Sequence, residues 1–198
     1  EGDYRPGITK LREVAGVDKV SAGVVGFRLA PRLNAAGRLA SAARGVELLL
    51  SNDKQVAQNI ATELDQCNRE RQEIEEATLL HSVARIENEL CNLHRSIVLA
   101  DSSWHPGVIG IVASRLVEKF NRPVILIAID PESGMGKGSG RSVQGLNLYH
   151  ALKHCSEWME GYGGHEFAAG LSIESRNVVS FARAFESYAC KSLSPEQL

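Results

Sequence analysis

The sequence predicts an α/β protein, with a small mixed sheet, a βαβ unit and flanking helices, preceded by a helical segment and one long connecting helix. Residues 53–90 contain neither Gly nor Pro, which favours the long helix. Short apolar runs at 96–100 and 124–129 are each followed by Asp, and residues 108–120 between them have apolar side chains at helical spacing. Strand, helix and strand in this order form a right-handed unit with parallel strands.

Residues 1–50 predict short helices. Pro6 suits the first turn of one of them, where its missing N–H has no cost. Residues 26–39 are interrupted by Pro31 and Gly37, so we expect turn and loop there, followed by a return to helix at 39–50. The chain opens without Met, in polar sequence, and we therefore expect a segment upstream of it.

The long helix at 53–90 is rich in Glu, Gln, Arg, Ala and Leu, and Ser51 or Asn52 is a suitable N-cap. Its apolar stripe is thin around Arg71, so we expect its middle to be exposed and the helix to connect two bodies. A coiled-coil arm is the alternative, which is disfavoured because Arg71 and His81 would occupy core positions.

The second half of the chain alternates strands and helices. After the βαβ unit we expect a glycine-rich turn at 134–142, a helix at 146–159, a tight turn at Gly163 and Gly164, a strand at 168–173 and a closing helix at 178–193. With 43% of the 198 residues hydrophobic, such a chain can bury a packed core.

Composition excludes several classes of protein. The net charge of −2 excludes a generic polycation, although 19–46 and 133–156 contain bases and no acids, which leaves room for a local anion site. No apolar run approaches the roughly twenty residues of a membrane helix, and no secretory signal is visible. The cysteines are outside C-x-x-C pairs, which indicates buried thiols of a reducing compartment and a cytoplasmic protein; they are Cys67, Cys91, Cys155 and Cys190.

Four segments could carry chemistry, and the first is residues 31–39. It holds Arg32, Asn34 and Arg38, and the planar guanidinium of Arg suits phosphate oxygens. The alternative is a helix-capping loop with ordinary surface arginines.

The second segment, residues 101–110, follows a predicted strand and opens a predicted helix. Ligands of open α/β sheets bind at the carboxyl ends of strands, and a helix N-terminus favours anions. Trp104 and His105 lie here, and Trp104 could stack on a base or pack in the core.

The third segment, residues 134–142, fails the phosphate-loop pattern because Gly138 follows Lys137 where Ser or Thr is required. It leads into Ser139, Arg141 and Ser142, whose hydroxyls and guanidinium could bind a phosphate. A hairpin turn with a bulge is the alternative.

The fourth segment places His165 after Gly163 and Gly164 and before two Ala and a Gly, which indicates tight backbone on both sides. An exposed His at such a turn can donate to a phosphate when protonated, or bind a metal when neutral. A structural His is the alternative.

Taken together and in order, these motifs resemble the RecJ family of the DHH phosphoesterase superfamily over nearly the whole chain. The matching runs are P-R-L-N-A-A-G-R-L, W-H-P-G-V-I-G-I-V-A-S-R, G-S-G-R-S and G-G-H-E-F-A-A-G. The resemblance implies two α/β lobes joined by a long helix. It implies a 5′-to-3′ single-stranded DNA exonuclease of recombination and repair, whose first lobe holds Mn²⁺ or Mg²⁺ and whose DHH-associated domain binds the strand.

The sequence departs from this family because it contains no Asp-His-His segment and no early Asp-x-Asp. Two-metal hydrolysis needs several convergent ligands. We therefore expect no metal in this chain and no activity of the chain alone. The expected parts are the tail end of the catalytic lobe at 1–50, the connecting helix at 51–93 and the DHH-associated domain at 94–198.

The resemblance also implies roles for the candidate residues. Arg32, Asn34 and Arg38 would face the 5′ end of the strand or the active cleft, and Trp104 and His105 would shape its wall. Ser139, Arg141 and Ser142 would hold phosphates, and His165, next to Gly163 and Gly164, would help to neutralise the phosphate under attack.

Single-stranded DNA is the expected partner, with a single-strand binding protein and a recombination helicase as further candidates, and no membrane. Two alternatives stay open, namely a DHH-family phosphodiesterase of oligoribonucleotides or cyclic dinucleotides, and a stand-alone binding module. A small-molecule nucleotide enzyme is disfavoured by the failed phosphate-loop patterns.

Overall fold

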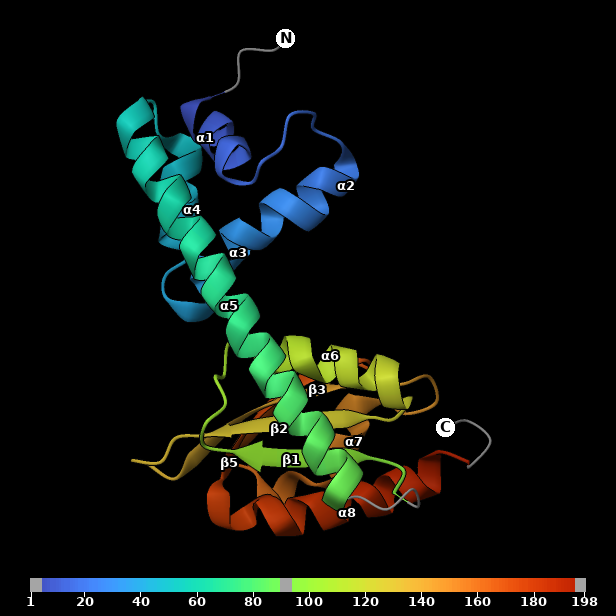
Figure 1. Ribbon diagram of the computed structural model, residues 1–198. Helices are drawn as coiled ribbons and strands as arrows, with labels where there is room; N and C mark the ends of the chain where they lie inside the picture. Colours follow the sequence, from blue (N-terminus) through green and yellow to red (C-terminus); the bar gives the residue numbers. More distant parts are fainter. Residues whose placement is uncertain (1–4, 90–93, 195–198) are drawn as a thin grey trace. The chain divides into compact units, whose positions relative to one another are not determined.

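A computed structural model describes residues 5–89 and 94–194, which form two compact units (Figure 1). The first, here called unit 1, ends at Ile74, and unit 2 begins at Glu75. The boundary falls inside helix α5 (Lys54–Glu89), so each unit contains part of this helix. The long helix predicted at 53–90 is therefore confirmed.

Unit 1 is built from helices. They are α1 (Pro6–Val14), α2 (Ala22–Val24), the π-helical turn η1 (Val25–Leu29), α3 (Ala30–Leu39), α4 (Ala43–Leu50) and the first part of α5. A small apolar core joins these helices, and it includes Leu11, Leu29, Leu48, Ile60 and Leu64. Unit 1 thus has a core of its own.

The prediction of turn and loop at 26–39 is wrong, because this stretch is helical and belongs to η1 and α3. Pro31 lies in the first turn of α3, where the backbone N–H has no partner inside the helix, so proline is tolerated. Gly37 is also accommodated, and a side chain there would approach Cβ of Ala42 to 3.3 Å.

Helix α5 is capped one residue later than expected. The carboxylate of Asp53 accepts hydrogen bonds from the N–H groups of Gln55 at 2.7 Å and Val56 at 2.9 Å, which makes Asp53 the N-cap instead of Ser51 or Asn52. Among the described residues of α5, none between Asn68 and Thr78 is buried, as expected for an exposed middle.

Unit 2 contains a five-stranded mixed sheet in the order β1-β2-β3-β5-β4. Strands β1 (Ile97–Asp101) and β2 (Val124–Ile129) are parallel and flank α6 (Ile109–Phe120), which confirms the predicted fold class and its βαβ unit. The other pairings are antiparallel and involve β3 (Met135–Arg141), β4 (Gly161–Gly164) and β5 (Ala168–Glu174).

Three expectations for unit 2 are wrong. The glycine-rich turn at 134–142 is strand β3, and the tight turn at 163–164 belongs to strand β4. The helix expected at 146–159 is shorter, since α7 (Leu148–His154) gives way to the 3₁₀ turn η2 (Ser156–Trp158). Glycine at every second position lets β3 fit in the middle of the sheet. Strand propensity alone would not predict a strand there, because glycine has a low propensity and β3 contains no β-branched residue.

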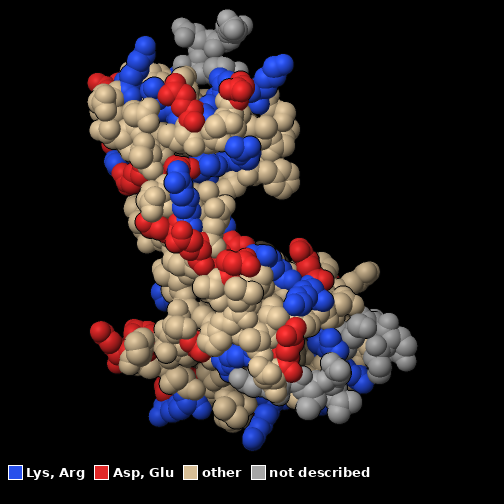
Figure 2. Space-filling model, in the orientation of Figure 1, with Lys and Arg blue, Asp and Glu red and all other residues tan. Residues whose placement is uncertain are grey.

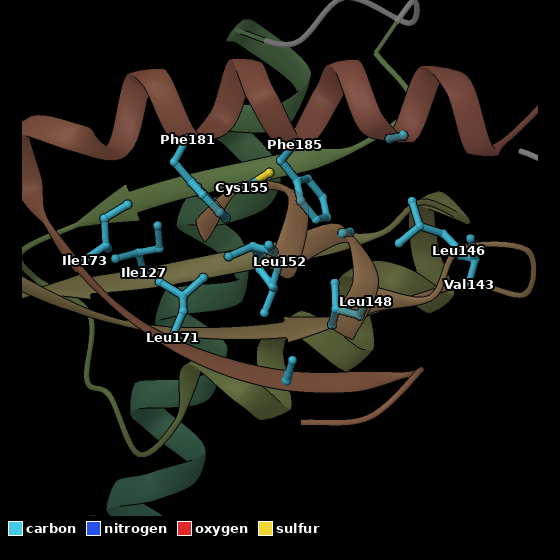
Figure 3. Close-up of a cluster of buried hydrophobic side chains, with 14 of the residues drawn as sticks. Ile127, Val143, Leu146, Leu148, Leu152, Cys155, Leu171, Ile173, Phe181 and Phe185 are labelled. Carbon is cyan, nitrogen blue, oxygen red and sulfur yellow. The ribbon is translucent and has the colours of Figure 1, made fainter. Parts of the chain in front are cut away.

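The main core lies between the sheet and helices α7 and α8 (Val178–Ser192), with the 3₁₀ turn η3 (Ser175–Asn177) leading into α8. Phe181 and Phe185 point from α8 toward the sheet, with ring centroids 5.9 Å apart, and they pack in one core with Leu152 of α7 and Cys155, the residue after α7 (Figure 3). Helix α6 covers the other face of the sheet (Figure 1).

Surface charge is mixed. Lys and Arg are interspersed with Asp and Glu over the visible face of both units, with no continuous basic surface (Figure 2). In the described part of the chain, no helix is both long and apolar enough to cross a bilayer.

The cysteines differ from the expectation in one respect. Cys155 is buried and Cys67 half-buried, but Cys190 is exposed, so the description as buried thiols is wrong for Cys190. Burial raises the pKa of the Cys155 thiol to about 11. Cys91 lies outside the described residues.

Candidate nucleic-acid interface

Strand β3 separates two environments by the alternation of its side chains. Gly136, Gly138 and Gly140 face the core under α7 and α8, and a Cβ atom on them would come within 2.7–2.9 Å of side-chain atoms of Ile127, Leu171 and Leu148, respectively. Residues Met135, Lys137, Ser139 and Arg141 therefore project from the opposite face. We call this the α6 face, because α6 packs on the same side of the sheet.

Ser139 and Arg141 meet on the α6 face beside the first turn of α6. The Nη1 group of Arg141 donates to Ser139 Oγ at 3.2 Å and to the carbonyl of Gly140 at 2.7 Å. A Cβ on Gly110 would lie 2.9 Å from Ser139 Oγ and 3.2 Å from Arg141 Nη2, so a side chain there would displace these two groups. The three residues form one small polar cluster.

The start of α6 adds a backbone donor to this cluster. The N–H groups of Val108 and Ile109 both donate to the carbonyl of His105, and the N–H of Gly107 donates to His105 Nδ1 at 3.1 Å. Among residues 5–89 and 94–194, no acceptor receives the N–H of Gly110. A backbone N–H, a hydroxyl and a guanidinium together suit a phosphate oxygen.

Two rows of paired residues, all small except Lys137, extend from the cluster across the α6 face. Ser139 pairs with Gly170, which pairs with Gly163; in the next row Lys137 pairs with Ser172, which pairs with Gly161. Gly161 and Gly163 have nothing within 4 Å of where a side chain would begin. These glycines therefore stand where there is room for a side chain, unlike Gly136, Gly138 and Gly140.

This smooth area contains a shallow depression. Its volume is about 350 Å³, and it is lined by residues of β3, β4 and β5 that include Lys137, Gly161, Gly170 and Ser172. In the described part of the chain, the ammonium group of Lys137 has no hydrogen-bond or ion-pair partner. A flat glycine surface with one available cation lets a ligand backbone lie close to the sheet.

His165 lies at the same end of the sheet as Arg141. Arg141 pairs with Ala168, and the N–H of His165 donates to the carbonyl of that same Ala168 at 2.8 Å. Arg141 of β3 and His165, which directly follows β4, thus lie on either side of Ala168, about 10 Å apart at the backbone. The His165 side chain is exposed and makes no hydrogen bond within the described residues.

Ser142 and Gly164 have structural tasks at this end of the sheet. Ser142 Oγ donates to the carbonyl of Leu146 at 2.8 Å, and its N–H donates to Phe167. Gly164 has φ +147°, and a Cβ there would lie 2.4 Å from the carbonyl of Ala168, so the backbone requires glycine. The Ser142 oxygen keeps lone pairs but no donor proton for a phosphate.

Trp104 is buried, and its position is fixed by α5. Its Nε1–H donates to His81 Nδ1 at 3.2 Å, and the two rings meet edge-on with centroids 5.7 Å apart. Asp101 binds the same loop through Ser103, whose N–H and Oγ donate to Asp101 Oδ1 at 2.9 and 2.6 Å. Although burial alone would raise the pKa of Asp101, the hydrogen bonds from Ser103 lower it, which keeps the carboxylate ionised.

The arginines of unit 1 differ from one another. Arg32 is mostly buried; its Nε donates to Asp65 Oδ1 at 2.8 Å, and its Nη1 donates to the carbonyl of Arg28 at 2.6 Å. Asp65 also pairs with Arg69. Asn34 and Arg38, in contrast, are exposed on α3.

In the part of the chain that the structure describes, the metal-ligating side chains do not form a catalytic metal site. Within residues 5–89 and 94–194, no group of three or more His, Cys, Asp or Glu lies together. Asp101 and Asp130 each bond to their own loop, through Ser103 and Ser133, respectively. Hydrolysis by two metal ions cannot be derived from these residues.

The sequence reading missed several residues of the α6 face. Gly161, Gly170 and Ser172 became visible only through strand pairing, and Gly110 and Lys137 were not selected as site residues. The signal for β3 was present in M-G-K-G-S-G-R, where glycine at every second position marks a strand with one crowded face.

Comparison with known proteins identifies relatives of this chain. Residues 93–191 match the family described as "DHHA1 domain". Two curated relatives are named single-stranded-DNA-specific exonuclease RecJ. The protein from Bacillus subtilis (strain 168) is 39% identical over 194 residues, and that from Escherichia coli (strain K12) is 41% identical over 206 residues. The matches cover 97% and 100% of this chain but only 25% and 36% of the relatives.

A solved structure agrees with these matches. RecJ from Thermus thermophilus, in complex with Mg²⁺, superposes with a TM-score of 0.85 at 37% identity, covering 96% of this chain and 29% of that one. The same protein has also been solved in complex with Mn²⁺.

Proposed function

The chain belongs to the DHHA1 domain family, and from this membership and the site geometry we propose that it binds the DNA strand in a single-strand-specific exonuclease. The observation that carries the proposal is the close approach of Arg141, Ser139 and Gly110 at the edge of a smooth glycine face. The relatives named as such exonucleases support the substrate class.

The physical role of the cluster is to hold one phosphate. The guanidinium of Arg141 supplies charge and two directed donors, and the Gly110 N–H supplies a donor at a helix start. Ser139 Oγ, which accepts from Arg141, can turn its own proton toward a phosphate oxygen. His165 is exposed and lies on the other side of Ala168 from Arg141. When protonated, its side chain donates a further hydrogen bond to the phosphate.

The glycine face then guides the rest of the strand. Gly163 and Gly170 allow the sugar-phosphate backbone to lie against β4 and β5, with Lys137 as a second cation. We further propose that Asn34 and Arg38 of unit 1 contact the same strand toward its 5′ end. Arg32 instead holds Asp65 and supports α3 and α5.

The cutting step belongs to residues outside this chain. We propose that this chain positions the substrate, while a separate lobe of the whole enzyme would hold Mg²⁺ or Mn²⁺, which would help to activate the attacking water. A single-strand binding protein and a recombination helicase remain predicted partners of the whole enzyme. The thiols of Cys67, Cys155 and Cys190 are free, which suits the proposed cytoplasmic location.

Binding of a fluorescent single-stranded DNA by the 198-residue chain tests the proposal. Arg141→Ala should weaken binding at least tenfold, about 1.4 kcal/mol. The matched control is Arg183→Ala, which removes the same charge from the exposed side of α8 on the opposite face of the sheet. Equal losses for both variants, or none for either, would contradict the proposed site.

Two further measurements separate the alternatives. A competing RNA of the same sequence that displaces DNA at equal concentration would favour an oligoribonucleotide phosphodiesterase. In a whole enzyme that contains this chain, Arg38→Ala, Arg141→Ala and His165→Ala should each slow cleavage about tenfold or more. Wild-type rates in all three would overturn the assigned roles.

A further inference from the structure

A second cavity lies on the α6 face, at the carboxyl ends of β1 and β2. Its volume is about 350 Å³, within the range of ligand sites, and its place is where open α/β sheets bind ligands. We propose that this pocket receives one nucleobase of the bound strand. The proposal rests on the proposed function and adds a base-binding subsite to the phosphate cluster.

The lining of the pocket suits a nucleobase. Its apolar lining includes Trp104, Pro106, Ala128 and Met135, and its polar lining comes from Asp130, Ser133 and Lys137. A base has two apolar faces and a polar edge, so it can stack on such walls while its edge meets donors and acceptors.

The pocket continues the proposed strand path. Met135, Lys137, Ser139 and Arg141 project from one face of β3, and alternate residues along a strand are about 7 Å apart. Lys137 lines both this pocket and the depression on the glycine face. Because Lys137 and Met135 lie about 13–20 Å from Arg141 along β3, a strand whose phosphate binds at Arg141 can place a base a few nucleotides away in the pocket without leaving the sheet.

The main wall of the pocket is preorganised. Trp104 is 5% exposed, and its Nε1–H is bonded to His81 Nδ1, so the indole ring is fixed before any ligand arrives. A fixed aromatic wall loses little conformational freedom on binding. Only the small accessible part of the indole can contact a base, and such an apolar contact tolerates any base.

Trp104 fluorescence provides a direct test. The chain has two tryptophans, so Trp158→Phe leaves Trp104 as the sole emitter, with Trp158 on the α7 side of the sheet. This variant of the full chain is titrated with single strands of one sequence, each carrying one abasic site at a successive position. Intact DNA should change Trp104 emission in a saturable way.

The expected result is a position-specific loss. An abasic site at one position should abolish the emission change and weaken binding about tenfold, while other positions bind like intact DNA. Saturable binding of intact DNA with unchanged Trp104 emission, or with equal affinity for every abasic strand, would overturn the base pocket.

Two variants keep the two proposals distinguishable. Met135→Ala removes a wall of the pocket and should reduce the preference for the intact strand, whereas Met159→Ala, a half-buried methionine packed against the α7 and α8 core, should retain it. Thermal unfolding checks that both variants fold. If Arg141→Ala binds DNA with wild-type affinity, the phosphate cluster is wrong. If Arg141→Ala weakens binding but every abasic strand binds with the same affinity as intact DNA, only the base pocket is wrong.

Discussion

The two faces of strand β3 differ in what fixes their residues. On the core face, Gly136, Gly138 and Gly140 are glycines because neighbouring side chains leave no room for a Cβ. On the α6 face, Lys137, Ser139 and Arg141 project away from that core. One strand thus keeps its packing and its chemistry on separate sides, so the two can be altered separately.

Glycines on other strands extend the same comparison. Gly163 lies on β4 with open space around it, so packing does not require glycine there. A side chain at Gly136 would disturb the core, whereas a side chain at Gly163 would occupy the surface that the strand is proposed to follow.

The largest effect is expected from Gly136→Val. A Cβ at this position would lie 2.7 Å from Ile127 and 2.9 Å from Ile129, and both neighbours are stiff β-branched residues. Overpacking should lower the free energy of unfolding by about 3 kcal/mol, measured by urea denaturation. An unchanged midpoint would show that the core face of β3 has spare room.

Unit 1 offers a second contrast, between Arg32 and Arg38. Arg32→Ala leaves the carboxylate of Asp65, which is 7% exposed, with only its exposed partner Arg69 and should lower the free energy of unfolding by about 2 kcal/mol. Arg38→Ala should change it by less than about 0.5 kcal/mol and act on DNA binding instead. Equal losses of stability in Arg32→Ala and Arg38→Ala would contradict the different roles of the two arginines.

Gly163→Val should separate binding from stability. Valine favours strands, and nothing lies near its Cβ, so stability should stay within about 0.5 kcal/mol of wild type. Affinity for single-stranded DNA should fall about tenfold, because the new side chain stands on the glycine face. Unchanged affinity would mean that the strand does not pass over β4.

The smallest effect is expected on the core face of the sheet, where α8 packs, and it depends on pH. Glu186 of α8 accepts hydrogen bonds from the N–H groups of Arg95 and Ser96, at 2.8 and 2.9 Å. Burial alone would raise the pKa of Glu186, but the hydrogen bonds from Ser96 and Arg95 outweigh it and lower the pKa below the ordinary 4.5. The folded state therefore gains stability from the ionised carboxylate.

Glu186→Gln should accordingly lower the free energy of unfolding by about 1 kcal/mol at pH 7. Because the folded pKa is lowered, this contribution is present above pH 4.5 and disappears as the pH falls through the folded pKa. Unfolding curves of both proteins at neutral and acidic pH test this. A difference that grows on acidification would reverse the assigned direction.

The sequence predicted the architecture better than its details. Periodicity located α5, α6 and the parallel pair β1 and β2, because each has one clear apolar pattern. Strand β3 was missed because its glycines are required by distant residues, such as Leu171 and Leu148, which local propensity does not contain. The helix at Pro31 was missed because a proline in a first turn resembles one in a loop.

The candidate site shows the same limit. Arg141 and His165 could be selected from their local motifs, but their shared neighbour Ala168 follows from the order β3-β5-β4, which no single segment specifies. Gly110 likewise depends on contact with Ser139 from another element. Residue types predicted the chemistry, and strand pairing determined which residues share the surface.

The salt dependence of DNA binding tests the central claim most directly, because each phosphate contact releases counterions. If Arg141 holds a phosphate, the slope of log K against log salt should become shallower by about 0.7 in Arg141→Ala than in the wild-type chain. Arg183→Ala should keep the wild-type slope. Identical slopes and affinities for wild type and Arg141→Ala would contradict a phosphate at this end of the sheet.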